Sequence, residues 1–266
     1  MAPSRLERLF RRGAAAPPDA VEGALPTFIT IGTMKGGTSS LHSYLRAHPQ
    51  IGMSRPKETD FFCKPDHGGH DLAWYRERFS DPGEQQGESS PNYTKRHLFD
   101  GVVERIHSVL PDIRLIFIAR DPIDRAVSHF LHNVEKGRVD HDQFASYFED
   151  LDNPVLLTSR YGYQIEPFIE TYGRERILVL ASEDLRDDRA ATLSQVFSFL
   201  GVDPDFSSPT FAVDRHVTSE KTSAVGDPLE GLTFSPDQRA RIADHLRPDI
   251  DAFRGLVGKE FAHWSV

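Results

Sequence analysis

The segment TFITIGTMKGGTSSLHSYL, residues 27–45, constrains the fold more than any other part of the chain. It begins with an apolar, β-branched run that is typical of a buried parallel strand. Gly32, Gly36 and Gly37 then permit a tight turn, and Thr38 opens a helix-like pattern. Because a helix N-terminus presents unpaired N–H groups at the positive end of its dipole, this strand, turn and helix predict an anion site, with phosphate as the usual ligand.

The spacing of this turn is close to that of a Walker A loop but differs at the lysine. Gly32 and Gly37 follow the G-x-x-x-x-G pattern, whereas the lysine expected after the second glycine is missing and Lys35 lies inside the loop. A plain ATPase is therefore disfavoured. A glycine turn without a ligand remains an alternative, but Lys35 and the hydroxyl residues Thr38 and Ser39 favour an anion site.

Length and composition favour one domain. With 266 residues, 38% of them hydrophobic and 10% aromatic, the chain is long enough for one sizeable α/β core and short for two. The sequence contains no apolar run of membrane-spanning length and no readable secretory signal, so we expect no transmembrane segment and a cytoplasmic protein. The single cysteine, Cys63, excludes an intrachain disulfide and fits a reducing compartment.

The charge distribution argues against polyanionic partners. The net charge is −9, the pI is near 5.7, and no dense Lys/Arg tract occurs after residue 12. Nucleic acids and heavily sulfated polysaccharides are therefore disfavoured, although a local basic groove would escape this average. Residues 1–26, with four arginines among alanines and prolines, are expected to be a flexible tail, with a membrane-surface or partner helix as the alternative. The remaining residues, 27–266, form the predicted domain.

The segment IRLIFIARDPIDRAVSHFLHNVEKG predicts a second anion site. Residues 113–119 have the composition of a buried strand, and Asp121 and Pro122 are N-cap and first-turn signals for the helix that follows. Arg120 stands at the carboxyl end of the strand, where a Walker B strand would present a metal-binding aspartate. Arginine binds anions with two hydrogen bonds, and Ser128 lies two turns along the helix. The alternative is that Arg120 pairs with a neighbouring carboxylate.

Two anion sites at the carboxyl ends of parallel strands suit a ligand with phosphates at both ends. ATP needs one cradle and a magnesium site, whereas a nucleotide with a separate ribose phosphate needs two cradles and no metal. Cys63, His67 and His70 are metal-ligand types, but their spacing matches no closed zinc pattern, so we expect no metal.

Later segments continue the alternation of strands and helices. Helices are predicted at 159–172, 189–200 and 235–264, and a buried strand at 177–180. The polar, acidic segment 134–157 is predicted to be a cap over the site. The fold class expected from this order is α/β, a single P-loop-like domain of three layers, α/β/α, with a mostly parallel central sheet.

At this level of detail the chain resembles a known family, the sulfotransferases that use 3′-phosphoadenosine 5′-phosphosulfate (PAPS), and most closely the heparan-sulfate branch with its bacterial relatives. The resemblance covers residues 27–264. The segments that carry it are ITIGTMKGGTSSLHSYLRAHP, KETDFF, LIFIARDPIDRAVSHFL, SRYGYQIEPFIETYGRERILVLASEDL and the C-terminal tryptophan.

The resemblance implies a role for each candidate donor-binding residue. Those implied to hold the 5′-phosphosulfate are Lys35, Gly36, Gly37, Thr38 and Ser39. Arg120 and Ser128 are implied to hold the 3′-phosphate. Tyr161 falls where relatives place an aromatic side chain near the adenine, and Lys221 lies in the loop that often closes over the cofactor.

The resemblance also implies the catalytic pair. Glu58 aligns with the glutamate that relatives use as general base, although the residues alone favour a solvated partner of Lys57. Lys35 is implied to neutralise the departing phosphate. Asp60 stands where the heparan-type pattern more often has histidine, so the acceptor of those relatives is not carried over.

The predicted function is therefore in-line transfer of a sulfuryl group from PAPS to a hydroxyl, or less often an amine, of a small molecule, glycolipid or natural product, with PAP as product. Two alternatives remain. One is a P-loop kinase or NTPase that acts on a small molecule and depends on magnesium. The other is a nucleotide-binding module that binds PAP without catalysis.

Overall fold

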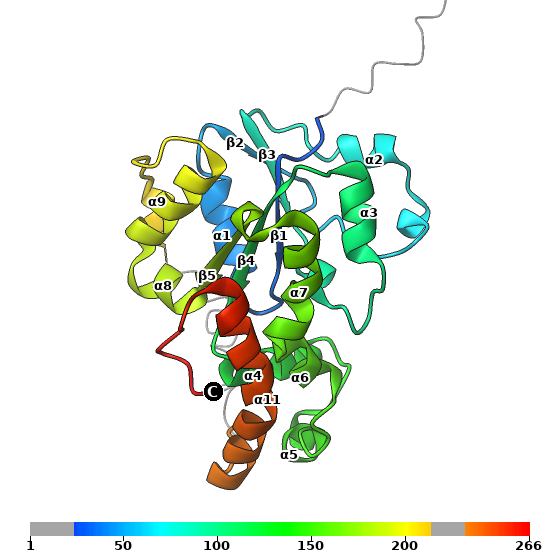
Figure 1. The fold of residues 1–266 in the computed structure, drawn as a ribbon, viewed down its shortest axis with the longest axis vertical. Coiled ribbons are helices and arrows are strands. Elements are labelled where there is room, and N and C mark those ends of the chain that lie inside the picture. The colour runs from blue at the N-terminus through cyan, green and yellow to red at the C-terminus, as the bar shows by residue number, and fades with distance from the viewer. Residues whose placement is uncertain (1–23, 214–231) are drawn as a thin grey trace, which may run out of the picture.

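A computed structural model describes residues 24–213 and 232–266 of the chain (Figure 1). Its centre is a five-stranded sheet, parallel throughout, with the strand order β2-β3-β1-β4-β5. The strands are β1 (Phe28–Gly32), β2 (Ile51–Met53), β3 (Gln85–Ser89), β4 (Arg114–Ala119) and β5 (Ile177–Ala181). The division between a tail at 1–26 and a domain at 27–266 stays a prediction, because residues 1–23 lie outside the described part.

Helices cover both faces of the sheet. The helices are α1 (Thr38–Leu45), α2 (Leu72–Arg76), α3 (Val102–Val109), α4 (Pro122–Glu135), α5 (Phe144–Tyr147), α6 (Pro154–Ser159), α7 (Tyr161–Tyr172), α8 (Ser182–Asp187), α9 (Arg189–Leu200) and α11 (Pro236–Val257). Helices α1, α8 and α9 pack on one face, and α3, α4, α6, α7 and α11 pack on the other (Figure 1). Within the described residues, no helix combines the length and apolar character needed to span a membrane.

The sheet has one hydrophobic core on each face, and the alternation of side chains along the strands explains why there are two. Successive side chains of a strand point to opposite faces, so Leu115 and Phe117 of β4 join the core under α3, α4 and α7, while Ile116 and Ile118 join the core under α1 and α9. Because both faces are covered, the strand is apolar at nearly every position rather than at every second one. The predicted three-layer α/β/α fold is confirmed.

The structure corrects two predicted helices. The helix predicted at 159–172 is interrupted at Arg160, whose ψ of 80° is not helical, so α6 ends at Ser159 and α7 begins at Tyr161. The helix predicted at 235–264 ends at Val257, before Gly258 with φ of 63°. The apolar spacing continues beyond that glycine, but there the side chains pack in a returning segment instead of on a helix.

The predicted cap at 134–157 contains α5 and an aromatic cluster. Phe144 and Phe148 are buried, and both pack against Phe130 of α4 and against Phe234. The aromatic side chains of this polar segment thus anchor it to α4 and to the chain just before α11. Its predicted position over the bound ligand stays a prediction.

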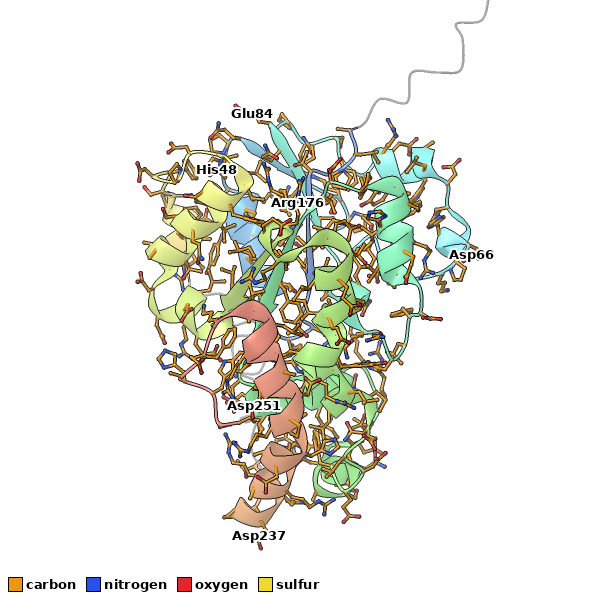
Figure 2. All side chains as sticks on the ribbon, in the orientation of Figure 1. His48, Asp66, Glu84, Arg176, Asp237 and Asp251 are labelled. Atoms are coloured by element: carbon orange, nitrogen blue, oxygen red, sulfur yellow. The ribbon has the colours of Figure 1, made fainter. Side chains whose placement is uncertain are left out.

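The carboxyl ends of β1, β3 and β4 meet at one edge of the sheet. β1 leads into the glycine turn and α1, β4 leads into Arg120 and α4, and β3 leads into a 3-10 helix, η2 (Pro91–Thr94). Glu84 and Arg176, which precede β3 and β5, lie on the opposite side of the molecule from Asp237 at the start of α11 (Figure 2). The two segments that the sequence marks as anion sites therefore share an edge.

Beneath this edge lies a fully buried carboxylate, Glu88 of β3. It accepts hydrogen bonds from four hydroxyl groups: from Tyr75 and Tyr93 at 2.9 Å each, from Ser90 at 3.2 Å and from Thr59. Among the residues that the structure describes, no cation lies within ion-pair distance of it. Burial raises the pKa of Glu88 to about 7, and the four hydrogen bonds oppose that rise.

This pKa predicts a pH-dependent stability. Between the ordinary value of 4.5 and about 7, the folded protein keeps a proton on Glu88 that the unfolded chain has lost, so the free energy of unfolding falls as pH rises and levels off above 7. The fall is on the order of 3 kcal/mol. Glu88→Gln should remove it, which denaturant titrations between pH 5 and 8 measure. Exposed Glu84→Gln is the control, and an unchanged slope in Glu88→Gln would contradict the prediction.

Candidate active site

The glycine turn between β1 and α1 is held against β4. The backbone N–H of Thr33 donates to the Ile118 carbonyl at 2.8 Å, and that of Gly36 donates to the Thr33 carbonyl at 2.9 Å. A Cβ on Gly36 would lie 2.4 Å from the Ile118 carbonyl oxygen, so only glycine fits there. Gly37 is the N-cap of α1 at φ of 107° and supplies no side-chain cap. No side chain at the N-cap position therefore occupies the start of α1, which is the kind of helix terminus that binds anions.

Arg125 supports this turn from behind. Its side chain is fully buried, and Nη1 donates to the Met34 carbonyl at 3.3 Å while Nε donates to Ser159 Oγ at 2.8 Å. Nη2 donates to the Val155 carbonyl. Burial lowers the pKa of Arg125 to about 10. Sequence reasoning missed this residue; its one signal was an arginine beside the inward-facing Ala126 of an amphipathic helix.

The segment that carries the predicted base lies beside the turn. Lys57 Nζ is 2.6 Å from Glu58 Oε1 and 3.5 Å from Oγ1 of Thr38, the first residue of α1. The Lys57–Glu58 pair is the alternative role considered for Glu58, but an ion pair this exposed adds little stability. The same lysine connects the glutamate to the loop, so the structure brings together two motifs that are distant in sequence.

Glu88 and Ser90 hold the backbone of the base segment in place. Ser90 Oγ accepts hydrogen bonds from the N–H groups of Thr59 and Asp60, at 3.1 and 3.2 Å, and donates to Glu88. Asp60 has φ of 50°, and its carboxylate accepts a hydrogen bond from Asn92 Nδ2 at 2.8 Å. Thr59 and Asp60 are thereby fixed to β3, and Glu58 extends from a rigid segment. Neither Glu88 nor Ser90 was recognised from the sequence.

The second predicted anion site lies at the start of α4. The Asp121 side chain caps this helix by accepting from the N–H groups of Ile123 and Asp124, at 2.9 and 3.0 Å, as predicted. The guanidinium of Arg120 makes no ion pair with any carboxylate in the described residues, so the carboxylate-pairing alternative is not observed there. Ser128 is buried on the same helix. An unpaired guanidinium beside a helix start fits an anionic ligand.

Tyr161 holds the backbone of Arg120. Its side chain is fully buried, and its hydroxyl donates to the Arg120 carbonyl at 2.7 Å. Its ring packs against Phe117, Phe253 and Trp264. The predicted contact of Tyr161 with adenine stays a prediction, and Lys221 lies outside the described residues.

The returning C-terminal segment supports the same turn. Trp264 Nε1 donates to Glu183 Oε2 at 3.3 Å, and the other oxygen of Glu183 accepts from the N–H of Asp121 at 2.9 Å. The N–H of Ser265 donates to the Asp121 side chain. The tryptophan quoted in the resemblance therefore has a structural role next to Arg120.

The histidines at this edge are neutral at pH 7. Burial, Lys57 and Arg46 lower the pKa of His42 to about 4. Burial, Arg125 and further neighbours, including Lys35, lower the pKa of His129 strongly. The charged groups that cause these shifts are cations, so the site is locally positive in a chain whose net charge is −9.

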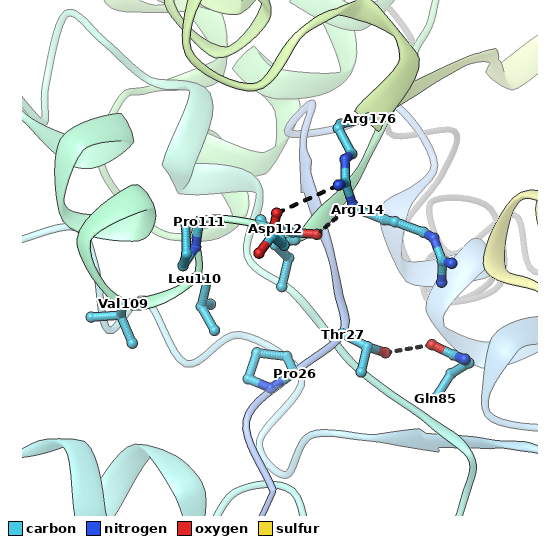
Figure 3. Close-up of a pocket in the computed structure, with 10 residues that line it drawn as sticks. Pro26, Thr27, Gln85, Val109, Leu110, Pro111, Asp112, Arg114 and Arg176 are labelled. Carbon is cyan, nitrogen blue, oxygen red and sulfur yellow. Dashed lines mark hydrogen bonds and ion pairs between the residues drawn. The ribbon is translucent and has the colours of Figure 1, made fainter.

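A separate cleft of about 470 Å³ lies at the amino edge of the sheet (Figure 3). Its polar side chains are mostly paired with one another or with the backbone. Thr27 donates to Gln85 at 2.7 Å, Arg176 bonds to Asp112, and Arg114 donates to the Leu200 carbonyl at 3.0 Å. The cleft lies at the amino edge of the sheet, opposite the edge that carries the two anion sites.

Comparison with known proteins shows the family to which the chain belongs. The family model for the sulfotransferase domain matches residues 25–226. The mouse heparan sulfate glucosamine 3-O-sulfotransferase 3B1 is 32% identical over 258 residues, which cover 89% of this chain and 64% of that protein. The human bifunctional heparan sulfate N-deacetylase/N-sulfotransferase 2 is 28% identical, over 68% of this chain and 22% of its own length. The chain thus spans less than two thirds of these relatives.

Solved structures share the fold. A sulfotransferase from Alicyclobacillus acidocaldarius superposes with a TM-score of 0.73 and 26% identity, over 91% of this chain and 100% of that one. A mouse sulfotransferase complexed with PAP has a TM-score of 0.52 and 17% identity, over 84% of each chain, and shows likeness of fold alone. Because the family model matches most of its length, the chain belongs to the sulfotransferase domain family.

Proposed function

We propose that the protein transfers the sulfuryl group of PAPS to a hydroxyl, or less often an amine, of a small molecule, glycolipid or natural product. The observation that carries the proposal is that three features lie at one edge of the sheet: the glycine turn with its lysine, a glutamate joined to the start of α1 through Lys57, and an arginine that has no carboxylate partner within residues 24–213 and 232–266. Membership of the sulfotransferase family supports it.

The donor would bind across β1 and β4, which are neighbours in the sheet. The start of α1, together with Lys35, Gly36, Gly37, Thr38 and Ser39, would hold the 5′-phosphosulfate. Arg120 and Ser128 would hold the 3′-phosphate. The fit rests on two features of this chain: a turn with no room for a Cβ at Gly36, and a guanidinium without a carboxylate partner among the described residues. Both suit a ligand with two separated anionic groups.

The chemistry needs two groups beyond binding. The acceptor oxygen attacks sulfur, the bond from sulfur to the bridging phosphate oxygen breaks, and the acceptor proton passes to the Glu58 carboxylate. Lys35 meets the negative charge that grows on the bridging oxygen and so stabilises the transition state more than the ground state. Glu58 is exposed enough to reach an acceptor while its backbone is fixed through Thr59 and Ser90.

The acceptor is proposed to be a neutral or weakly charged small molecule. The curated relatives carry heparan sulfate in their names. This chain has a net charge of −9 and places the carboxylates of Glu58 and Asp60 beside the loop. Repulsion between these carboxylates and a sulfated polysaccharide disfavours that polymer.

Substitution of Lys35 in the glycine turn tests the proposed sulfuryl-transfer mechanism directly. Lys35→Ala should lower turnover about a hundredfold or more, because a positioned charge that stabilises the transition state is lost. The measurement is mass spectrometry of an acceptor library incubated with PAPS, which detects the addition of one SO₃ group. Exposed Lys64→Ala is the matched control. Near wild-type turnover in Lys35→Ala would refute the mechanism.

Substitution of the proposed base, Glu58, distinguishes an effect on catalysis from an effect on donor binding. Glu58→Gln should abolish transfer and leave the affinity for PAP unchanged, because the amide cannot take the acceptor proton. Turnover and calorimetric PAP binding are compared with those of exposed Glu77→Gln. If the loss appears in PAP affinity instead, Glu58 has a structural role.

Arg120 is tested with two nucleotides that differ in the 3′-phosphate. Arg120→Ala should weaken PAP by about tenfold to a hundredfold, the range for a lost charge-assisted hydrogen bond, and leave adenosine 5′-phosphosulfate much less affected. Arg176→Ala, at the opposite edge of the sheet, is the control. Equal losses for both nucleotides would exclude the 3′-phosphate role.

A further inference from the structure

Lys95 is a buried cation that the sequence reasoning did not single out. It directly follows η2, the 3-10 helix at the carboxyl end of β3, and its relative exposure is 7%. Its Nζ lies 2.8 Å from the sulfur of Met34, the residue before Lys35 in the glycine turn. In the ranges 24–213 and 232–266, no carboxylate lies within ion-pair distance of this ammonium.

A lysine in this position is unfavourable for the unliganded fold. A thioether is a weak acceptor, so the ammonium loses hydration without gaining a comparable partner. Burial and Arg125 lower the pKa of Lys95 to about 8, whereas Asp60 and Glu58 oppose that change. A methionine would fill similar space without a charge to desolvate. A bound anion would give the retained charge a partner.

The location of Lys95 indicates which anion that is. On one side lies Met34, whose carbonyl Arg125 holds and whose neighbour Lys35 belongs to the donor site. The carboxylates of Asp60 and Glu58 belong to the base segment, and both act on the charge of Lys95. The ammonium therefore lies next to the donor loop and within the influence of the base segment, and in the proposed function the sulfuryl group is transferred between these two parts.

We propose that Lys95 binds the non-bridging oxygens of the sulfuryl group, as a second cation next to Lys35. This inference rests on the proposed function and extends it. During the step, the bond from the acceptor oxygen to sulfur forms, the bond from sulfur to the phosphate oxygen breaks, and the acceptor proton goes to Glu58. Lys95 keeps its protons and donates hydrogen bonds to sulfuryl oxygens throughout.

The proposal predicts a difference between donor and product. PAPS carries the sulfuryl group and PAP does not, so Lys95→Met should weaken PAPS by about tenfold and leave PAP within about twofold. Isothermal titration calorimetry without acceptor measures both affinities. Lys95→Arg retains a charge and should retain the preference for PAPS over PAP, which also covers the case in which Lys95→Met does not fold. Exposed Lys64→Met controls for the change in net charge.

Three results would overturn the proposal, and they differ from one another. Equal weakening of PAPS and PAP by Lys95→Met would make Lys95 a support for the turn. An unchanged ratio together with a higher KM for the acceptor would assign Lys95 to an anionic acceptor. If the wild-type protein binds neither nucleotide, the proposed function fails with it, whereas the first two results leave the proposed function intact.

Discussion

The site depends on positive charge that is buried without carboxylate partners among the residues that the structure describes. Arg125 bonds to carbonyls, a hydroxyl and an imidazole, and Lys95 rests on a thioether. In a medium of low dielectric such groups are expensive to desolvate, and their field is little screened by water. Burial, with nearby cations as a secondary cause, lowers the pKa of the neighbouring His42 and His129, so both imidazoles are neutral. The carboxyl edge of the sheet is thus organised for an anion before one arrives.

Local signals predicted the framework well. A glycine turn that needs close backbone approach, an Asp-Pro helix start and runs of apolar residues are properties of neighbouring residues. The starts of β1, α1, β4 and α4 were therefore read from the sequence to within about one residue. The break at Arg160 and the end of α11 at Gly258 were missed. Apolar spacing continued across both, and only tertiary packing decides whether such residues extend a helix or turn back on it.

The residues of the candidate site show the same contrast between local sequence signals and tertiary packing. Lys35 and Arg120 were found from the glycine turn and the end of a buried strand, whereas the catalytic role of Glu58 came from the resemblance to a family; all three follow segments that meet at the predicted edge. Arg125, Glu88 and Lys95 were not found, because their significance comes from burial and from partners that are distant in sequence. Nothing in the sequence around Lys95 distinguishes it from an exposed lysine. Its burial becomes apparent only in the fold, where its ammonium contacts Met34. Sequence reasoning sees the groups that contact a ligand more readily than those that hold them in place.

The four hydroxyl groups that donate hydrogen bonds to Glu88 also limit how this site can change during evolution. Its donors come from three stretches of chain: Thr59 in the base segment, Tyr75 in α2, and Ser90 and Tyr93 after β3. Loss of one donor leaves a buried carboxylate short of a partner, and loss of the carboxylate leaves buried hydroxyl groups without an acceptor. Substitutions at these positions are therefore expected to be tolerated in combination rather than singly. A change in acceptor preference is therefore expected to arise more easily from substitutions of exposed side chains in the base segment than from substitutions of Glu88 and its hydrogen-bond donors.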